Sequence, residues 1–177
     1  MTLRPAPDCQ RCDLCRKRHN IVMPAGSPDS KVVFVGEAPG ENEDLQGTPF
    51  IGRSGKILDN AMEEAGFSRD DIMITNTVKC RPPANRNPMP EEMAACRPFL
   101  ESELKGRSLI VGLGKFACSD LMGYEGSMRS IVNRIVQIDI GGEKVDFLPT
   151  YHPAACIYNR ESLTFLKEAM VIVRSRL

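Results

Sequence analysis

Residues 31–40 read Lys-Val-Val-Phe-Val-Gly-Glu-Ala-Pro-Gly, and this stretch decides the fold class. Its first five residues are mostly apolar, which is typical of a strand buried on both faces within a parallel sheet. An acidic loop follows from Glu37 to Arg53, and it contains Gly40, Gly47 and Gly52. Glycine lets the backbone come close to a ligand. The stretch therefore predicts an α/β protein with a ligand-binding loop directly after a buried strand.

Outward from this stretch, predicted strands alternate with predicted helices. Short apolar runs predict strands at residues 31–35, 71–77 and 108–112 and a hairpin of residues 131–140 and 144–148. Helical spacing predicts helices between the caps Ser54 and Gly66, from Pro90, over 115–122, and from about residue 161. Pro98 is expected to kink or divide the second of these helices.

This order predicts a single domain, residues 1–177, built as a three-layer α/β/α sandwich around a mainly parallel central sheet. Ligands of such sheets bind outside the carboxyl ends of the strands. Glu37, Asn76 and His152 each end or follow a predicted strand, so we expect these three side chains to converge.

Composition limits the functional classes. The chain is 42% apolar and 26% charged, as in globular proteins, and no apolar run approaches the roughly 20 residues that span a bilayer. Seven cysteines without an export signal favour a reducing cytoplasm over a disulfide framework. The 23 basic and 23 acidic residues balance, which argues against a non-specific DNA coat. Any DNA binding must therefore use a local basic face.

Four cysteines form two distant pairs, with spacings C-x2-C and C-x15-C: Cys9 and Cys12, then Cys80 and Cys96. Four thiolates can hold zinc or a [4Fe-4S] cluster. The wide second spacing favours the bulky cluster, with zinc as the less favoured occupant. Cys15 also forms C-x2-C with Cys12, so spacing alone leaves the choice between Cys9 and Cys15 open.

Five further stretches occur in a specific order and spacing: Gly36-Glu37-Ala38-Pro39-Gly40-x-x-Glu43-Asp44, Gly47-x-Pro49-Phe50-Ile51-Gly52-x-x-Gly55, Ile74-Thr75-Asn76, Lys79-Cys80-Arg81-Pro82-Pro83-x-Asn85-Arg86 and His152-Pro153-Ala154. Together they resemble the family 4 uracil-DNA glycosylases, the iron–sulfur type, over essentially the whole chain. The resemblance implies the uracil-DNA glycosylase fold. It also implies a monofunctional repair enzyme that hydrolyses the N-glycosidic bond of uracil in DNA, releases free uracil and leaves an abasic site for base excision repair.

The same resemblance implies a ligand set for the cluster. The family pattern C-x2-C-x-Leu with a later basic residue fits Cys9, Cys12, Leu14 and Arg18, which makes Cys15 a bystander. Cys9, Cys12, Cys80 and Cys96 would then hold a structural [4Fe-4S] cluster. This cluster would clamp the N-terminal segment to the loop between Cys80 and Cys96.

The residue types near the first loop suit excision of a flipped base. Phe50 is expected to stack on uracil, Asn76 to read its O4 and N3–H edge, and His152 to donate a hydrogen bond to O2 as negative charge develops. The resemblance favours Glu37, with Glu43 second, for orienting water or stabilising the sugar cation. A backbone amide at Ala38, where family 1 enzymes carry aspartate, and the Asn85 side chain complete the predicted uracil-binding set.

We expect DNA contacts from Arg53 and Arg86 and an apolar wedge from Ile157 or Tyr158. The expected partner is DNA containing uracil, for a monomer associated with the nucleoid in the cytoplasm; a replication clamp is a further candidate partner. Two alternatives stay open: a metal-clamped nucleic-acid-binding module without catalysis, and a glycosylase that takes other bases, for example deaminated purines.

Overall fold

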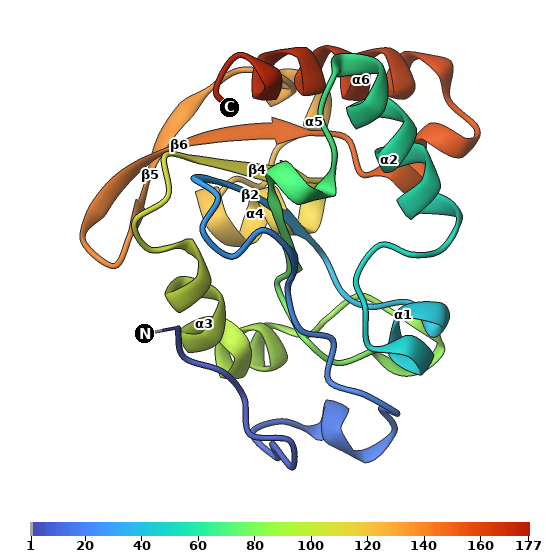
Figure 1. Ribbon diagram of the computed structural model, residues 1–177. Helices are drawn as coiled ribbons and strands as arrows, with labels where there is room; N and C mark the ends of the chain where they lie inside the picture. Colours follow the sequence, from blue (N-terminus) through green and yellow to red (C-terminus); the bar gives the residue numbers. More distant parts are fainter. Residues whose placement is uncertain (1) are drawn as a thin grey trace.

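The computed structural model describes residues 2–177 and is built on a six-stranded sheet with the order β1-β3-β2-β4-β6-β5 (Figure 1). The strands are β1 (Ala25–Gly26), β2 (Val32–Gly36), β3 (Met73–Asn76), β4 (Leu109–Leu113), β5 (Val136–Ile140) and β6 (Glu143–Thr150). The four central strands β3, β2, β4 and β6 are parallel, whereas the edge strands β1 and β5 pair antiparallel with their neighbours. The prediction of a mainly parallel central sheet is confirmed.

Helices lie on both faces of this sheet. The α-helices are α1 (Glu41–Gln46), α2 (Arg53–Ala65), α3 (Pro90–Leu104), α4 (Lys115–Met122), α5 (Met128–Ile131) and α6 (Arg160–Arg174). Short 3₁₀ helices occur at η1 (Asp13–Arg16), η2 (Arg69–Asp71), η3 (Pro83–Asn85) and η4 (Pro153–Ile157). None of the helices within residues 2–177 has both the length and the apolar character needed to cross a bilayer.

Strand β2 shows how the three layers form. Val32 and Phe34 pack in the core beneath α2 and α6, whereas Val33 and Val35 pack in the core beneath α3 and α4. All four side chains are fully buried, which explains the continuous apolar run in the sequence. Both faces of the strand need apolar side chains because both are covered. The predicted three-layer α/β/α arrangement is therefore confirmed.

The first loop differs from the prediction because it contains helix α1. The carboxylates of its first turn favour a helix N-terminus, and Gly47 ends the helix in the left-handed conformation with φ 74°. Helix α2 begins at Arg53 with Gly52 as its N-cap, so the prediction of Ser54 as the cap was wrong. The segment between β2 and α2 is therefore more helical than the sequence patterns indicated.

Two further elements differ. Helix α3 continues through Pro98, so the helix is not divided there. One lost backbone hydrogen bond is tolerated because the neighbouring Phe99 and Leu100 are buried in the core. The predicted strand 131–140 begins only at Val136, because Asn133 turns the chain with φ 58° and donates from its side chain to the carbonyl of Phe165.

Candidate functional site

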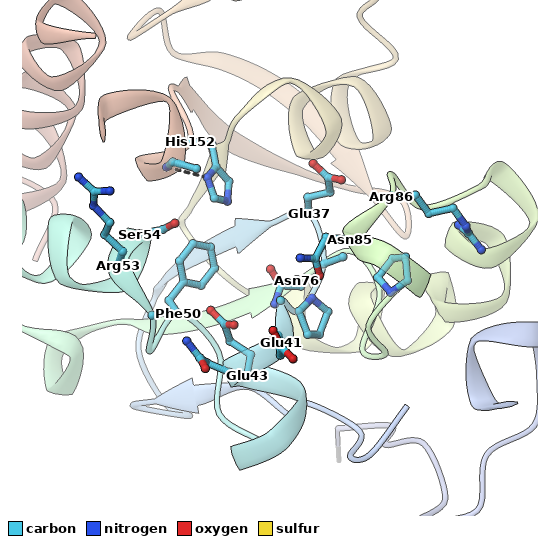
Figure 2. A pocket seen from close by; sticks show the side chains of 17 residues that line it. Glu37, Glu41, Glu43, Phe50, Arg53, Ser54, Asn76, Asn85, Arg86 and His152 are labelled. Atoms are coloured by element: carbon cyan, nitrogen blue, oxygen red, sulfur yellow. Dashed lines mark hydrogen bonds between the residues drawn. The ribbon is translucent and has the colours of Figure 1, made fainter. Parts of the chain in front are cut away.

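A cavity of about 460 Å³ opens at the carboxyl ends of the central strands. Figure 2 shows the rings of Phe50 and His152 beside one another on one side of it, with Arg86 pointing away on the other. The residues predicted to catalyse or bind the ligand all line this cavity: Glu37, Ala38, Glu43, Phe50, Asn76, Asn85 and His152. The topology therefore brings the predicted side chains together.

Asn76 lies at the floor of the cavity as the last residue of β3, where it is opposite Gly36 of β2. It is 3% exposed, and its Oδ1 atom has no hydrogen-bond partner in the part of the chain that the structure describes. A Cβ on Gly36 would lie 2.5 Å from this oxygen and 2.4 Å from the Phe50 ring. A buried amide oxygen without a partner costs free energy, which is typical of a side chain that completes its bonds with a ligand.

Lys79 bonds to the backbone of Asn76, a role that its place at the start of the motif Lys79-Cys80-Arg81 does not indicate. Its Nζ atom donates to the Asn76 carbonyl at 2.8 Å, to Thr75 Oγ1 at 2.6 Å and to Glu103 Oε2 at 2.7 Å. Lys79 and Glu103 are both fully buried. This ion pair fixes the backbone that carries the Asn76 amide.

Phe50 forms one wall of the cavity, with its ring centroid 5.6 Å from that of His152 and the planes inclined by 31°. The side chain is 4% exposed, and its backbone adopts φ 54°. A left-handed conformation is uncommon for a residue other than glycine. The Phe50 carbonyl accepts a hydrogen bond from Arg69, a second residue that the sequence patterns did not indicate.

His152 presents a defined tautomer to the cavity. Its Nδ1 atom accepts a hydrogen bond from the Ala154 amide at 3.0 Å, so the proton of the neutral ring lies on Nε2. Burial lowers the pKa of His152 to about 4, which keeps the imidazole neutral near pH 7. Gly114, with φ 90°, permits this placement because a Cβ there would lie 2.7 Å from the His152 Cβ. The site thus offers a neutral N–H donor.

The carboxylates of the first loop have different surroundings. Burial raises the pKa of Glu37, whose carboxylate has no hydrogen-bond partner among residues 2–177. Glu43 also lines the cavity, whereas Asp44 on the same helix points away from it and is 1% exposed. Burial alone would raise the pKa of Asp44, but hydrogen bonds from His19 and the Asn20 amide outweigh it and hold that pKa below its ordinary value.

The predicted DNA-contacting residues fall at different places. Arg53 is exposed on the cavity wall, and its guanidinium lies 5.8 Å from the ring centroid of Tyr158, which is 88% exposed. Arg86 also lines the cavity but is bonded to Glu92 by two contacts of 2.6 and 3.0 Å. Ile157 lies in η4, is partly buried and does not line the cavity.

The paired cysteines meet at a second hollow, which Lys79 also lines. Cys9, Cys12, Cys80 and Cys96 line one small hollow, and Cys15 is not part of its lining. Arg18 donates to the Cys80 sulfur at 3.5 Å, and burial raises the pKa of the Cys80 thiol to about 11. Within residues 2–177 no three His, Cys, Asp or Glu side chains are arranged to hold a single metal ion. The four thiols share one hollow, as a common metal centre requires.

Sequence comparisons agree with this geometry. A family model described as the Uracil DNA glycosylase superfamily matches residues 23–173, and the chain belongs to that superfamily.

Within it, the chain is similar to type-4 enzymes. It is 45% identical to the Type-4 uracil-DNA glycosylase of Thermotoga maritima over 87% of this chain and 80% of that relative. The Type-4 enzymes of Saccharolobus solfataricus and Archaeoglobus fulgidus are 41% and 40% identical, over 90% and 88% of this chain and 77% and 81% of the relatives. The family predicted from the sequence motifs is confirmed.

Proposed function

We propose that the protein is a uracil-DNA glycosylase that hydrolyses the N-glycosidic bond of uracil in DNA and leaves an abasic site. The observation that carries this proposal is the shared placement of Phe50, Asn76 and His152 around one cavity. An aromatic ring, an unpartnered amide and a neutral N–H donor are what recognition of a flipped pyrimidine requires. Membership of the superfamily supports the same reaction.

In the bond-breaking step, the electron pair of the N–C1′ bond leaves with the base, so positive charge develops on the sugar and negative charge on uracil O2. His152 would donate its Nε2–H to that oxygen. Its low pKa suits this role because the imidazole stays neutral and keeps its N–H directed at the cavity while Nδ1 is bound to Ala154. A preorganised donor stabilises charge that develops in the transition state.

Water would then add to C1′ and pass a proton to the carboxylate that orients it, and the departing uracil anion would take up a proton in turn. Glu37 is the first candidate to orient this water, because its partly buried carboxylate has a raised pKa and no partner within the described chain, and Glu43 is the second. The backbone at Ala38 lines the same wall and can share in binding the base.

Asn76 would select uracil through the amide at the cavity floor, since one amide supplies both a donor for O4 and an acceptor for N3–H. Phe50 would stack on the ring of the flipped base. Asn85 would act at the cavity mouth, where it is exposed, has φ 54°, and accepts a hydrogen bond from Arg81 at 2.8 Å.

The DNA strand would run over the rim that carries Arg53. The exposed Tyr158 ring beside this arginine is better placed than the partly buried Ile157 to enter the duplex as the base leaves. Arg86 would contact phosphate only through the part of its guanidinium that Glu92 leaves accessible.

For the metal, Cys9, Cys12, Cys80 and Cys96 would hold a [4Fe-4S] cluster, since these four thiols line one hollow. The cluster would supply no chemistry to the reaction and would hold the N-terminal segment against α3 as part of one domain. Replacing Cys9 by serine should lower the iron and acid-labile sulfide content, whereas Cys15→Ser, the matched control, should leave both unchanged. Equal loss in both variants would contradict this ligand set.

The activity is tested with a duplex oligonucleotide containing one uracil, followed by alkali to cleave any abasic site. The chain has only two histidines, so His19→Ala is a matched control for His152→Ala. We expect scission by the wild type and by His19→Ala, and a rate at least about 100-fold lower for His152→Ala. Absence of scission by wild-type protein that contains its metal would contradict the proposal, as would full activity of His152→Ala.

A further inference from the structure

Phe50 is held in an unfavourable backbone conformation by residues outside the cavity. Its φ of 54° places an aromatic residue in the left-handed region. Such a conformation persists only where the surrounding structure determines it from several directions. Gly55 of α2 is one support, because a Cβ there would lie only 1.8 Å from the Phe50 carbonyl oxygen.

Arg69 is the second support, and it bonds to the backbone rather than to a side chain of the cavity. Its Nη1 atom donates to the Pro49 carbonyl at 2.9 Å and its Nη2 atom donates to the Phe50 carbonyl. Its Nε atom lies 2.5 Å from Asp59 Oδ1 on α2, and Nη2 lies 3.3 Å from the other carboxylate oxygen. The planar guanidinium therefore ties two consecutive carbonyls to helix α2.

We propose that Arg69, oriented by Asp59, is a positioning residue for base excision, which rests on the proposed role of Phe50 in stacking on the flipped base. Arg69 does not line the cavity and acts only through the Phe50 backbone. With the carbonyls of residues 49 and 50 fixed, the Phe50 ring stays beside His152 and above Asn76 before DNA binds. Without Arg69, the backbone relaxes toward negative φ and the ring leaves this position.

Arg69 can be reached from solvent. Its side chain is 23% exposed, and it borders a surface hollow of about 220 Å³ with Asp59. A small cation can therefore reach the place of the missing guanidinium in Arg69→Ala. Arg107 is a matched control, because it also donates to two loop carbonyls, but these belong to Pro28 and Ser30, and neither of those residues lines the cavity as Phe50 does.

The test compares single-turnover excision of uracil by the wild type, Arg69→Ala, Arg69→Lys and Arg107→Ala with enzyme in saturating excess. We expect Arg69→Ala to lower the saturated rate about 100-fold, as a displacement of a reacting group by about 1 Å does, with unchanged affinity for uracil-free duplex. Arg69→Lys keeps the charge beside Asp59 but cannot donate to both carbonyls as the planar guanidinium does, so we expect a roughly tenfold lower rate. Guanidinium chloride, at concentrations well below those that unfold the protein, should raise the Arg69→Ala rate relative to sodium chloride of equal ionic strength.

Three results would overturn the inference: an Arg69→Ala rate close to that of the wild type, an equal loss in Arg107→Ala, or a loss that comes only from weaker DNA binding. If the wild type does not excise uracil, the proposed function fails instead. A crystal structure of Arg69→Ala then tests the geometry independently. Phe50 at negative φ supports the positioning role, and Phe50 at unchanged positive φ contradicts it.

Discussion

Acid should destabilise the protein through His152, by an amount that the structure sets. Burial lowers the pKa of His152 from an ordinary 6.5 to about 4. The folded protein therefore keeps this ring neutral as the pH falls from 6.5 toward 4, while the unfolded chain takes up a proton. Proton uptake by the unfolded state alone favours unfolding, so stability is lost across this interval and the loss levels off below the folded pKa.

The magnitude follows from the difference between the two pKa values. Each pKa unit corresponds to about 1.4 kcal/mol, so a difference of roughly 2.5 units gives about 3.5 kcal/mol in full, of which about 3 kcal/mol is lost between about pH 7 and about pH 4. At a urea dependence of about 1–3 kcal/mol per molar, this loss lowers the unfolding midpoint by at least about 1 M. The lowered pKa of Asp44 acts below its unfolded value of 3.8 and so lies outside the interval.

The assay is urea unfolding of the wild type and of His152→Gln at intervals across this pH range. Glutamine keeps a hydrogen-bonding side chain but does not titrate, so the difference between the two proteins isolates the histidine. We expect the wild type to lose about 3 kcal/mol more than the variant on acidification. Parallel loss of stability in both proteins would show that burial does not hold His152 neutral.

Three further predictions concern the proposed catalytic carboxylate Glu37 and two residues that shape the cavity, Gly36 and Lys79. The saturated excision rate should fall as the pH falls through the raised pKa of Glu37, because the carboxylate is lost there; Glu37→Gln should be slower by a factor of about 100 or more and flat over this range, and a pH profile shared by both proteins would contradict this. Gly36→Ala should fold but lower the single-turnover rate by about 100-fold, since its Cβ would lie 2.4 Å from the Phe50 ring and displace it. A rate like that of the wild type would show that the Phe50 ring can move aside without loss of activity. Lys79→Met should cost about 3–5 kcal/mol in urea unfolding by leaving the Glu103 carboxylate buried without its cation, and Lys79→Met/Glu103→Leu should regain most of it; equal stability of the single and double variants would exclude the ion pair as the cause.

The sheet could be predicted because its central strands are buried on both faces. A run such as Val32–Gly36 favours this arrangement, since a strand covered by a layer on each face needs apolar residues at consecutive positions. The convergence of Glu37, Asn76 and His152 followed from the same topology. Parallel strands place their carboxyl ends at one edge, so a residue at a strand end is placed without any knowledge of its contacts.

The short helices could not be predicted in the same way. Helix α1 has six residues and lies between glycines, so it lacks the two turns that make an apolar stripe visible. The start of α2 at Arg53 shifts the cap to Gly52, a residue whose conformational freedom suits a loop as well as a helix N-terminus. Local propensity is weak over such lengths, and tertiary packing decides the boundary.

The roles of Lys79 and Arg69 could not be predicted for another reason, although Lys79 stands within one of the quoted motifs. Each acts on a backbone carbonyl, that of Asn76 or that of Phe50, and a carbonyl is present at every position of the chain. No residue type marks the acceptor, so no motif pairs it with its donor. Only the positive φ of Phe50 and the burial of Lys79 reveal these bonds, and both are properties of the folded chain.

These two cations explain how the cavity can be rigid before DNA is bound. To bind the flipped base, the side chains of Asn76 and Phe50 would each need a fixed position. That position depends on a fixed backbone at the same residue. Lys79 holds the Asn76 backbone from the side of the cysteine hollow, and Arg69 holds the Phe50 backbone from the side of α2. Since Cys80 directly follows Lys79, any clamp on Cys80 also restrains the buried ammonium that orders Asn76. The cysteine hollow can therefore influence the geometry of the cavity, although its four cysteines do not line that cavity.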